Sequence, residues 1–105
     1  MGFIITTEYE ETNSGAVAEG MYVNIRNFSV EWIDVQEVVE EKKETVRKYY
    51  VNSLASIHIS QGKRPIHSFG VRFESNKLAI EGNLPALIYA WLKANKFATH
   101  EFQDT

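Results

Sequence analysis

The stretch that decides the fold of this chain is FGVRFESNKLAIEGNLPALIYAWLKANKF, residues 69–97. Its first part places Phe69, Val71 and Phe73 at alternate positions, and an apolar period of two residues predicts a strand with one buried face. The polar residues 74–77 then predict a turn or bulge. We interpret Leu78-Ala79-Ile80, which follows, as a remnant of the strand.

The second part of this stretch predicts a helix over about residues 84–95. Asn83 is a favourable N-cap, and Pro85 fits the first turn, where its missing N–H would have been unpaired anyway. An apolar stripe at helical spacing follows, made of Leu84, Leu87, Ile88, Trp91 and Leu92. A helix with one apolar stripe needs one sheet face to cover. The stretch therefore predicts an α+β domain with one C-terminal helix packed on one face of a sheet.

The rest of the chain supplies the other strands of that sheet, which we expect to be antiparallel, with about four to five strands and long hairpins. The predicted strands are residues 3–9 (an extra N-terminal strand), 21–32, 45–60 and 68–73. Gly62 and Pro65 predict a turn between the last two strands, which then form an antiparallel hairpin. Residues 98–105 are predicted to be a short tail, and residues 1–105 a single domain.

The apolar phase of the strand over residues 21–32 slips by one residue near Asn27. Before Asn27 the apolar residues occupy odd positions. After it they occupy even positions, namely Phe28, Val30 and Trp32. Such a slip predicts a β-bulge. We favour an interpretation in which both apolar sets belong to the core. The alternative is that Phe28 and Trp32 form a partner-binding face.

The segment 33–44 (IDVQEVVEEKKE) has two interpretations. Val35, Val38 and Val39 have the spacing of a short amphipathic helix. The β-branched valines and the run of Glu and Lys favour strand ends that meet in an exposed loop, and this is our prediction.

Composition excludes several classes of function. The chain has no cysteine, which excludes disulfides, cysteine–zinc sites, thiol catalysis and iron–sulfur clusters. His58, His67 and His100 are too scattered to predict a metal site. No nucleophile, base and oxyanion set can be named, so we expect a protein that is not an enzyme and has no cofactor.

The basic residues give a second candidate surface. Lys63 and Arg64, together with Arg47, Lys48 and Arg72, would form a basic patch beside two tyrosines if the predicted sheet brings them together. The net charge of −3 makes nucleic acid an improbable partner, and favours solvated charges at strand edges. The candidate partner-contact residues are Phe28, Trp32, Tyr50, Lys63 and Arg64.

From Gly20 to Asp104 the chain resembles a group of small bacteriophage virion-associated proteins. The resemblance lies in the strand opening Tyr22-Val23-Asn24-Ile25, in a long strand pair and in a Phe-rich strand. It ends with a helix that carries Gly82, Asn83, Tyr89, Leu92 and Lys93, with Phe97 shortly after. This chain differs in its N-terminal strand and in Pro85 and Trp91.

The resemblance implies a non-enzymatic structural or accessory protein of the phage tail, baseplate or neck. It implies other virion proteins and copies of this chain as partners, and the virion, assembled in the bacterial host cytoplasm, as the location. We expect no membrane association. The alternative function is a small phage-encoded inhibitor that binds a host defence protein, a role that suits acidic α+β domains of this size.

Overall fold

The computed structural model describes residues 2–105 and contains a five-stranded antiparallel sheet, a separate two-stranded hairpin and a small helical part. The strands are β1 (Phe3–Ile5), β2 (Tyr9–Glu11), β3 (Ala16–Ala18), β4 (Met21–Val39), β5 (Lys42–His58), β6 (Pro65–Ser75) and β7 (Phe102–Asp104). The helices are α1 (Lys77–Glu81), α2 (Leu84–Trp91) and the π-helical turn η1 (Leu92–Lys96). The sheet order is β6-β5-β4-β1-β7, and β2 pairs with β3. The predicted antiparallel α+β arrangement is confirmed.

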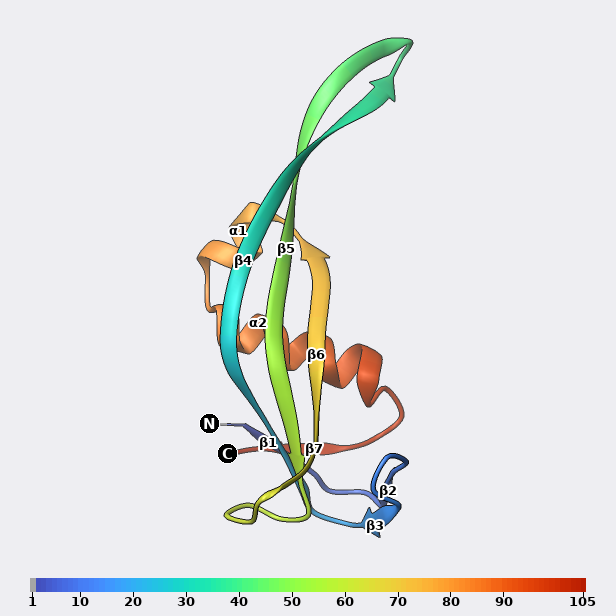
Figure 1. Cartoon of the computed structure of the whole chain (residues 1–105), viewed down its shortest axis with the longest axis vertical. Coiled ribbons are helices and arrows are strands. Elements are labelled where there is room, and N and C mark those ends of the chain that lie inside the picture. The colour runs from blue at the N-terminus through green and yellow to red at the C-terminus, as the bar shows by residue number, and fades with distance from the viewer. Residues whose placement is uncertain (1) are drawn as a thin grey trace.

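The hairpin of β4 and β5 dominates the molecule (Figure 1). Its strands pair antiparallel from Tyr22 with His58 up to Val39 with Lys42. Glu40 and Glu41 form the turn, and their φ angles of 50° and 67° are both positive, as in the two-residue turns that match the twist of a hairpin. The prediction for residues 33–44 is therefore confirmed: strand ends meet in an exposed turn, and no helix forms there.

The predicted bulge is also confirmed, since the β4–β5 register shifts between Arg26 and Ser29 and Asn27 has a φ of 54°. The expectation that both apolar sets lie in the core is wrong for the second set. Phe28 is 47% exposed and Trp32 54% exposed. Both rings are therefore exposed on the surface of β4 and do not join the buried core.

The core lies between the helical segment and one side of the sheet, which α2 crosses at an angle (Figure 1). On the helical segment, Ile88, Tyr89 and Leu92 are buried. Trp91 stacks on Phe73 of β6, with ring centroids 5.0 Å apart and planes within 6°. The buried sheet residues that complete the core are Phe3, Ile5, Met21, Val23, Val51, Ala55, Ile57 and Val71.

The helical part is more divided than one helix over residues 84–95. Residues 78–80, interpreted above as a strand remnant, belong to α1, because the Asn76 side chain accepts a hydrogen bond from the Ala79 N–H and caps a new helix. Asn83 caps α2 as predicted, with its side chain 3.2 Å from the Ala86 nitrogen. α2 ends at Trp91, and the turns that follow are π-helical.

Both ends of the chain differ from their predictions. The N-terminal segment 3–9 is split, so that β1 joins the main sheet and β2 joins the small hairpin. The predicted tail contains β7, whose Phe102 lies opposite Ile5 of β1. Thr105 continues this pairing by donating its N–H to the Gly2 carbonyl. Strand pairing across about a hundred residues leaves no local signal, which explains the miss.

Candidate functional site

The feature that no other element covers is the distal end of the β4–β5 hairpin. The last residue pair between β5 and β6 joins Tyr49 to Ser75, so residues 33–48 continue as two strands alone. We call residues 33–48 the arm. The arm makes the molecule 53 Å long, while its other dimensions are 22 and 20 Å (Figure 1).

Both edges of the arm are open. On the β4 side, β1 pairs only as far as Val23, and the next outward N–H, that of Ile25, donates to the Tyr89 hydroxyl. Within residues 2–105, no strand pairs with β4 on that side beyond this point, nor with β5 beyond Tyr49 on the other side. Open edges expose backbone donors and acceptors that can pair with another chain.

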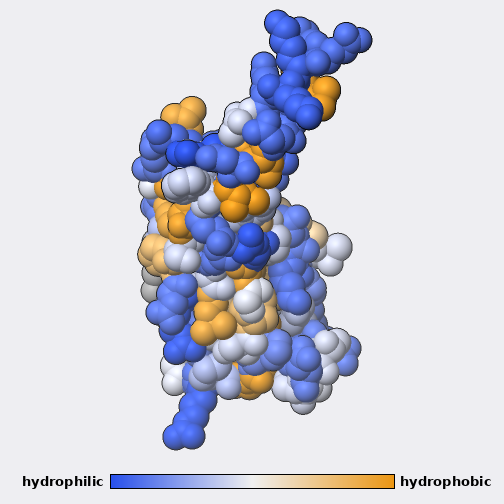
Figure 2. Space-filling view, turned by 45° about the horizontal axis from the view of Figure 1, so that its top comes forward, coloured by the Kyte–Doolittle hydropathy of each residue, from blue (hydrophilic) through white to orange (hydrophobic). Residues whose placement is uncertain are grey.

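Apolar side chains gather where the arm leaves the body (Figure 2). Ile33 is 44% exposed, and Val39, nearer the tip, is 43% exposed. On the helix side of β4, Phe28 and Trp32 are exposed, as is Leu78 of α1. The surface toward the tip is mostly hydrophilic (Figure 2). We call the junction of arm and body, around Trp32, Ile33 and Tyr50, the arm base. It combines aromatic and aliphatic surface with charged strands.

An ionic ladder links the two strands of the arm. The Arg47 guanidinium donates two hydrogen bonds to Asp34, of 2.9 and 3.2 Å, and its carbon lies 3.9 Å from the centroid of the Trp32 ring. These hydrogen bonds, together with the positive charge of Arg47, hold the pKa of Asp34 below its ordinary value. Such exposed pairs contribute little to stability, because water screens them, so the ladder sets register more than stability.

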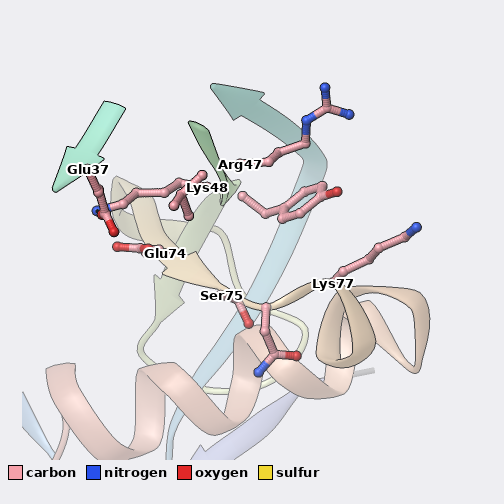
Figure 3. A pocket seen from close by; sticks show the side chains of 9 residues that line it. Glu37, Arg47, Lys48, Glu74, Ser75 and Lys77 are labelled. Carbon is pink, nitrogen blue, oxygen red and sulfur yellow. The ribbon is translucent and has the colours of Figure 1, made fainter. Parts of the chain in front are cut away.

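A hollow lies beside β5 where β6 ends (Figure 3). Lys48 projects across it to Glu37, with nitrogen and oxygen 3.2 Å apart, and Glu74 lies beside the pair. The hydrogen bond to Glu37, and the negative charges of Glu37 and Glu74, raise the pKa of Lys48. The hollow is lined by Glu37, Val46, Arg47, Lys48, Tyr49, Glu74, Ser75, Asn76 and Lys77.

The structure does not bring all predicted contact residues together. Phe28 and Trp32 lie near the arm base on the helix side, because the pair of Val30 is the core residue Val51. Tyr50 lies on the opposite face, under the Arg72 guanidinium at 4.7 Å from the ring centroid. Both faces of the arm base thus carry an arginine on an aromatic ring.

Lys63 and Arg64 lie elsewhere. They occupy the exposed turn after β5, at the end of the strand away from the arm. From Arg47 to the end of β5 at His58 the strand runs about 36 Å, at about 3.3 Å per residue. The basic patch considered from the sequence, which required Lys63 and Arg64 near Arg47 and Lys48, is therefore wrong.

The histidines are also separated. His58 contacts the Lys63 carbonyl and the Asn24 side chain, His67 contacts Asn13, and His100 contacts Thr7. No group of three metal-ligating side chains occurs in residues 2–105.

A smaller hollow of about 280 Å³ beside α2 is lined in part by Lys93, which pairs with Asp104 at 2.5 Å. No helix in residues 2–105 is long and apolar enough to cross a membrane.

Sequence reasoning missed the charged residues of the arm. The signal was present: residues 31–37 contain three acids and no base, whereas residues 42–48 contain four bases and one acid. Two such segments on either side of a turn predict a hairpin with an acidic and a basic strand. Treating the whole charge run as one solvated segment concealed this asymmetry.

Comparison of the chain with protein-family models, with curated proteins and with solved structures finds no match.

Proposed function

We propose that this protein is a non-enzymatic assembly subunit that joins partner proteins through its arm. The observation that carries the proposal is that residues 33–48 extend past the last β6 pair with both edges open. A two-stranded hairpin alone is marginally stable in water, because it buries little apolar surface. A partner strand on an edge, or a partner surface on a face, would supply the missing burial.

The side chains at the arm base favour a protein as the partner. Trp32 and Tyr50 lie on opposite faces, and each is stacked by an arginine. Aromatic residues and arginine are the types most enriched at protein interfaces and at their energetic centres. The acidic net charge of −3 argues against a nucleic-acid partner, which would require a basic face.

In this proposal the C-terminal helical segment serves as the single cover of one sheet face. Ile88 and Leu92 are fully buried there. The face on which Tyr50 lies, and the arm, are left to partners. The body then acts as a folded base, and the arm as the element that connects it to its neighbours.

The sequence resemblance suggests which assembly this is. It favours a bacteriophage particle, with the protein as a structural or accessory component of the tail, baseplate or neck. The partners would then be other virion proteins and copies of this chain, brought together in the bacterial host cytoplasm.

The test uses a variant without the arm. In the arm-shortened variant, Asn-Gly replaces residues 34–47 and joins Ile33 to Lys48, which are partners in the register. This pair is six residues below the natural turn on each strand, so the hydrogen-bonding pattern needed by a two-residue loop is kept. We expect the variant to fold with unchanged thermal stability and to be lost from purified particles that contain the whole chain.

Two outcomes would overturn the proposal. One is absence of the whole chain from intact particles, combined with capture of one host protein as the dominant partner, which would favour the inhibitor. The other is normal incorporation of the arm-shortened variant, which would mean that the arm is not the connecting element. Circular dichroism of the variant serves as the control for folding.

A further inference from the structure

We infer that the partner of the arm is a second copy of this chain, and that the two arms pair antiparallel along their β4 edges about a two-fold axis at Val35. This inference rests on the proposed function and names its partner. A two-fold contact uses the same surface of both copies and closes at a dimer. Three observations carry it: the protection of the two edges, the ion pairs of the arm and the steric limits on the register.

The two open edges of the arm differ in how they are protected. Natural proteins block an open edge with charged side chains, above all with lysine. The β5 part of the arm carries Lys42, Lys43, Arg47 and Lys48, whereas β4 has no lysine or arginine after Arg26. The β4 edge is therefore the one that remains open to another strand.

The exposed apolar side chains lie on this same strand. Within residues 2–105, no large apolar side chain of β5 is exposed, whereas six are exposed on β4 beyond the bulge: Phe28, Val30, Trp32, Ile33, Val38 and Val39. They occupy both faces of the strand, so a strand added at this edge would cover apolar surface on each face. An open edge with such a surface is a site for pairing with another chain.

The acids of β4 do not oppose the approach of an identical strand, because each contacts a base on the side away from the open edge. The ion pairs are Glu31–Arg72, Asp34–Arg47 and Glu37–Lys48, with the bases on β5 and β6. The β4 edge therefore carries no excess charge that would require a basic partner strand.

Side-chain direction limits the register of two identical strands. Opposite residues in an antiparallel pair share a face, so each residue lies opposite itself or opposite a residue an even number of positions away. An axis at Asp34 would place Asp34 beside its own copy and Glu31 beside Glu37, where like charges repel. An axis at Gln36 would place Glu31 beside Glu41 of the turn, and is excluded for the same reason.

An axis at Ile33 is excluded by the body of the protein. It would place the turn residue Glu41 of one copy opposite Ile25 of the other, whose N–H already donates to the Tyr89 hydroxyl. On the same edge β1 pairs up to Val23. The incoming turn would thus meet a part of the edge that is already occupied.

An axis at Val35 avoids both problems. Val35 lies opposite its own copy, and Trp32 lies opposite Val38, so that two exposed side chains cover each other. Each acid lies opposite an uncharged side chain, in the pairs Glu31–Val39, Asp34–Gln36 and Glu37–Ile33. The segment 31–39 is therefore complementary in charge to itself in the reverse direction, which favours a second copy over an unrelated strand.

The two bodies do not collide in this register. Residues 21–28 of the second copy lie beyond the turn of the first, where β4 has ended at Val39 and no strand continues its edge. β1 pairs with residues 21–23, at the end of β4 away from the turn, so it lies past the tip of the other arm (Figure 1). β5 and β6 lie on the far side of their own β4. The paired arms thus form a four-stranded connection with one body at each end.

Cysteine cross-linking tests the position of the axis, because the natural chain has no cysteine. Opposite residues of an antiparallel pair have Cα atoms about 4.5–5.5 Å apart, a distance that a disulfide can span. We expect oxidised Val35→Cys to form at least tenfold more disulfide-linked dimer than Val46→Cys. Val46 is the matched control, because it pairs with Val35 within the chain and is equally half-buried. Circular dichroism checks that both variants fold.

A third variant, Ile33→Cys, tests the register. Ile33 lies opposite Glu37 in the assigned register, so it should form few cross-links with its own copy. Three results would overturn the inference: more cross-linking for Ile33→Cys or Val46→Cys than for Val35→Cys, equal cross-linking in all three, or no linked Val35→Cys at the highest soluble concentration.

Charge placed at the axis provides a second readout that needs no oxidation. Val35→Lys and Val35→Glu each bring two like charges together and should weaken self-association by about tenfold in sedimentation equilibrium. An equimolar mixture of the two should regain the dimer, because unlike charges then meet at the axis. Val46→Lys should leave association unchanged. A mixture as weak as either variant alone would contradict the two-fold contact.

The inference and the proposed function can fail separately. If no variant shows pairing between copies and the arm-shortened variant is still lost from particles, the inference fails and the proposed function stands. If the arm-shortened variant is incorporated normally, the proposed function fails whatever the cross-linking shows.

Discussion

The assignment of residues to the core or to the arm can be tested by making the same substitution, isoleucine to alanine, in each. Ile88 of α2 is 0% exposed, whereas Ile33 of the arm is 44% exposed. Isoleucine to alanine removes three carbons, which at about 0.8 kcal/mol per buried CH₂ gives about 2.4 kcal/mol for Ile88. The cavity left in a packed core increases this to about 3–4 kcal/mol, within the range of about 2–5 for such changes. For Ile33→Ala we expect about 1 kcal/mol at most, because no full cavity forms.

The assay is urea denaturation in a Trp32→Phe background, where Trp91 is the remaining tryptophan and reports on the body. Protein concentration is kept low enough that the chain is monomeric. We expect the midpoint to fall sharply for Ile88→Ala and hardly at all for Ile33→Ala, with similar slopes. Equal losses for the two variants, or a loss below about 1 kcal/mol for Ile88→Ala, would refute the assignment of core and arm.

Two further predictions concern local structure. Replacing Glu40-Glu41 by Asn-Gly should stabilise the turn of the arm by about 1–2 kcal/mol, because Asn and Gly adopt positive φ more readily than Glu; slower amide exchange at Val38 and Lys43 would show this, and unchanged exchange would contradict it. Glu11 is 2% exposed and its pKa is lowered to about 2 by hydrogen bonds from the Ser14 and Asn13 side chains and backbone. Because this folded-state pKa is below the ordinary value of 4.5, the carboxylate contributes stability above about pH 4.5 and loses it as the pH falls toward 2. Glu11→Gln should therefore remove part of the acid sensitivity of unfolding between these values, and an unchanged pH profile would contradict the assignment.

The elements predicted well were those with local signals. Alternating apolar residues predicted the hairpin of β5 and β6, the phase slip at Asn27 predicted the bulge, and Asn83 predicted the start of α2. Each depends on residues that are neighbours in the sequence, which is why the sequence alone was sufficient.

The features that the sequence did not predict depend on contacts between residues that are distant in the sequence, or on the absence of a neighbouring element that would cover a residue. β7 forms because Phe102 pairs with Ile5 of β1, which is distant from it in the sequence. Phe28 and Trp32 have the pattern of core residues, and they are exposed because the elements packed on the sheet leave this part of β4 uncovered. The same reason explains the candidate site. The sequence pattern predicts strand ends within residues 33–44, but only the last pairs of β1 and β6, at Val23 and Tyr49, determine that the arm has two open edges.

The most direct test of the central claim, that the arm connects this protein to its partners, is a competition between two chains. The whole chain and the arm-shortened variant are expressed together at equal levels during particle assembly, and their ratio in purified particles is measured by mass spectrometry. The arm as connector predicts that the variant is depleted at least tenfold relative to the whole chain while its folded fraction stays the same. Equal amounts of both chains in the particles would contradict the claim.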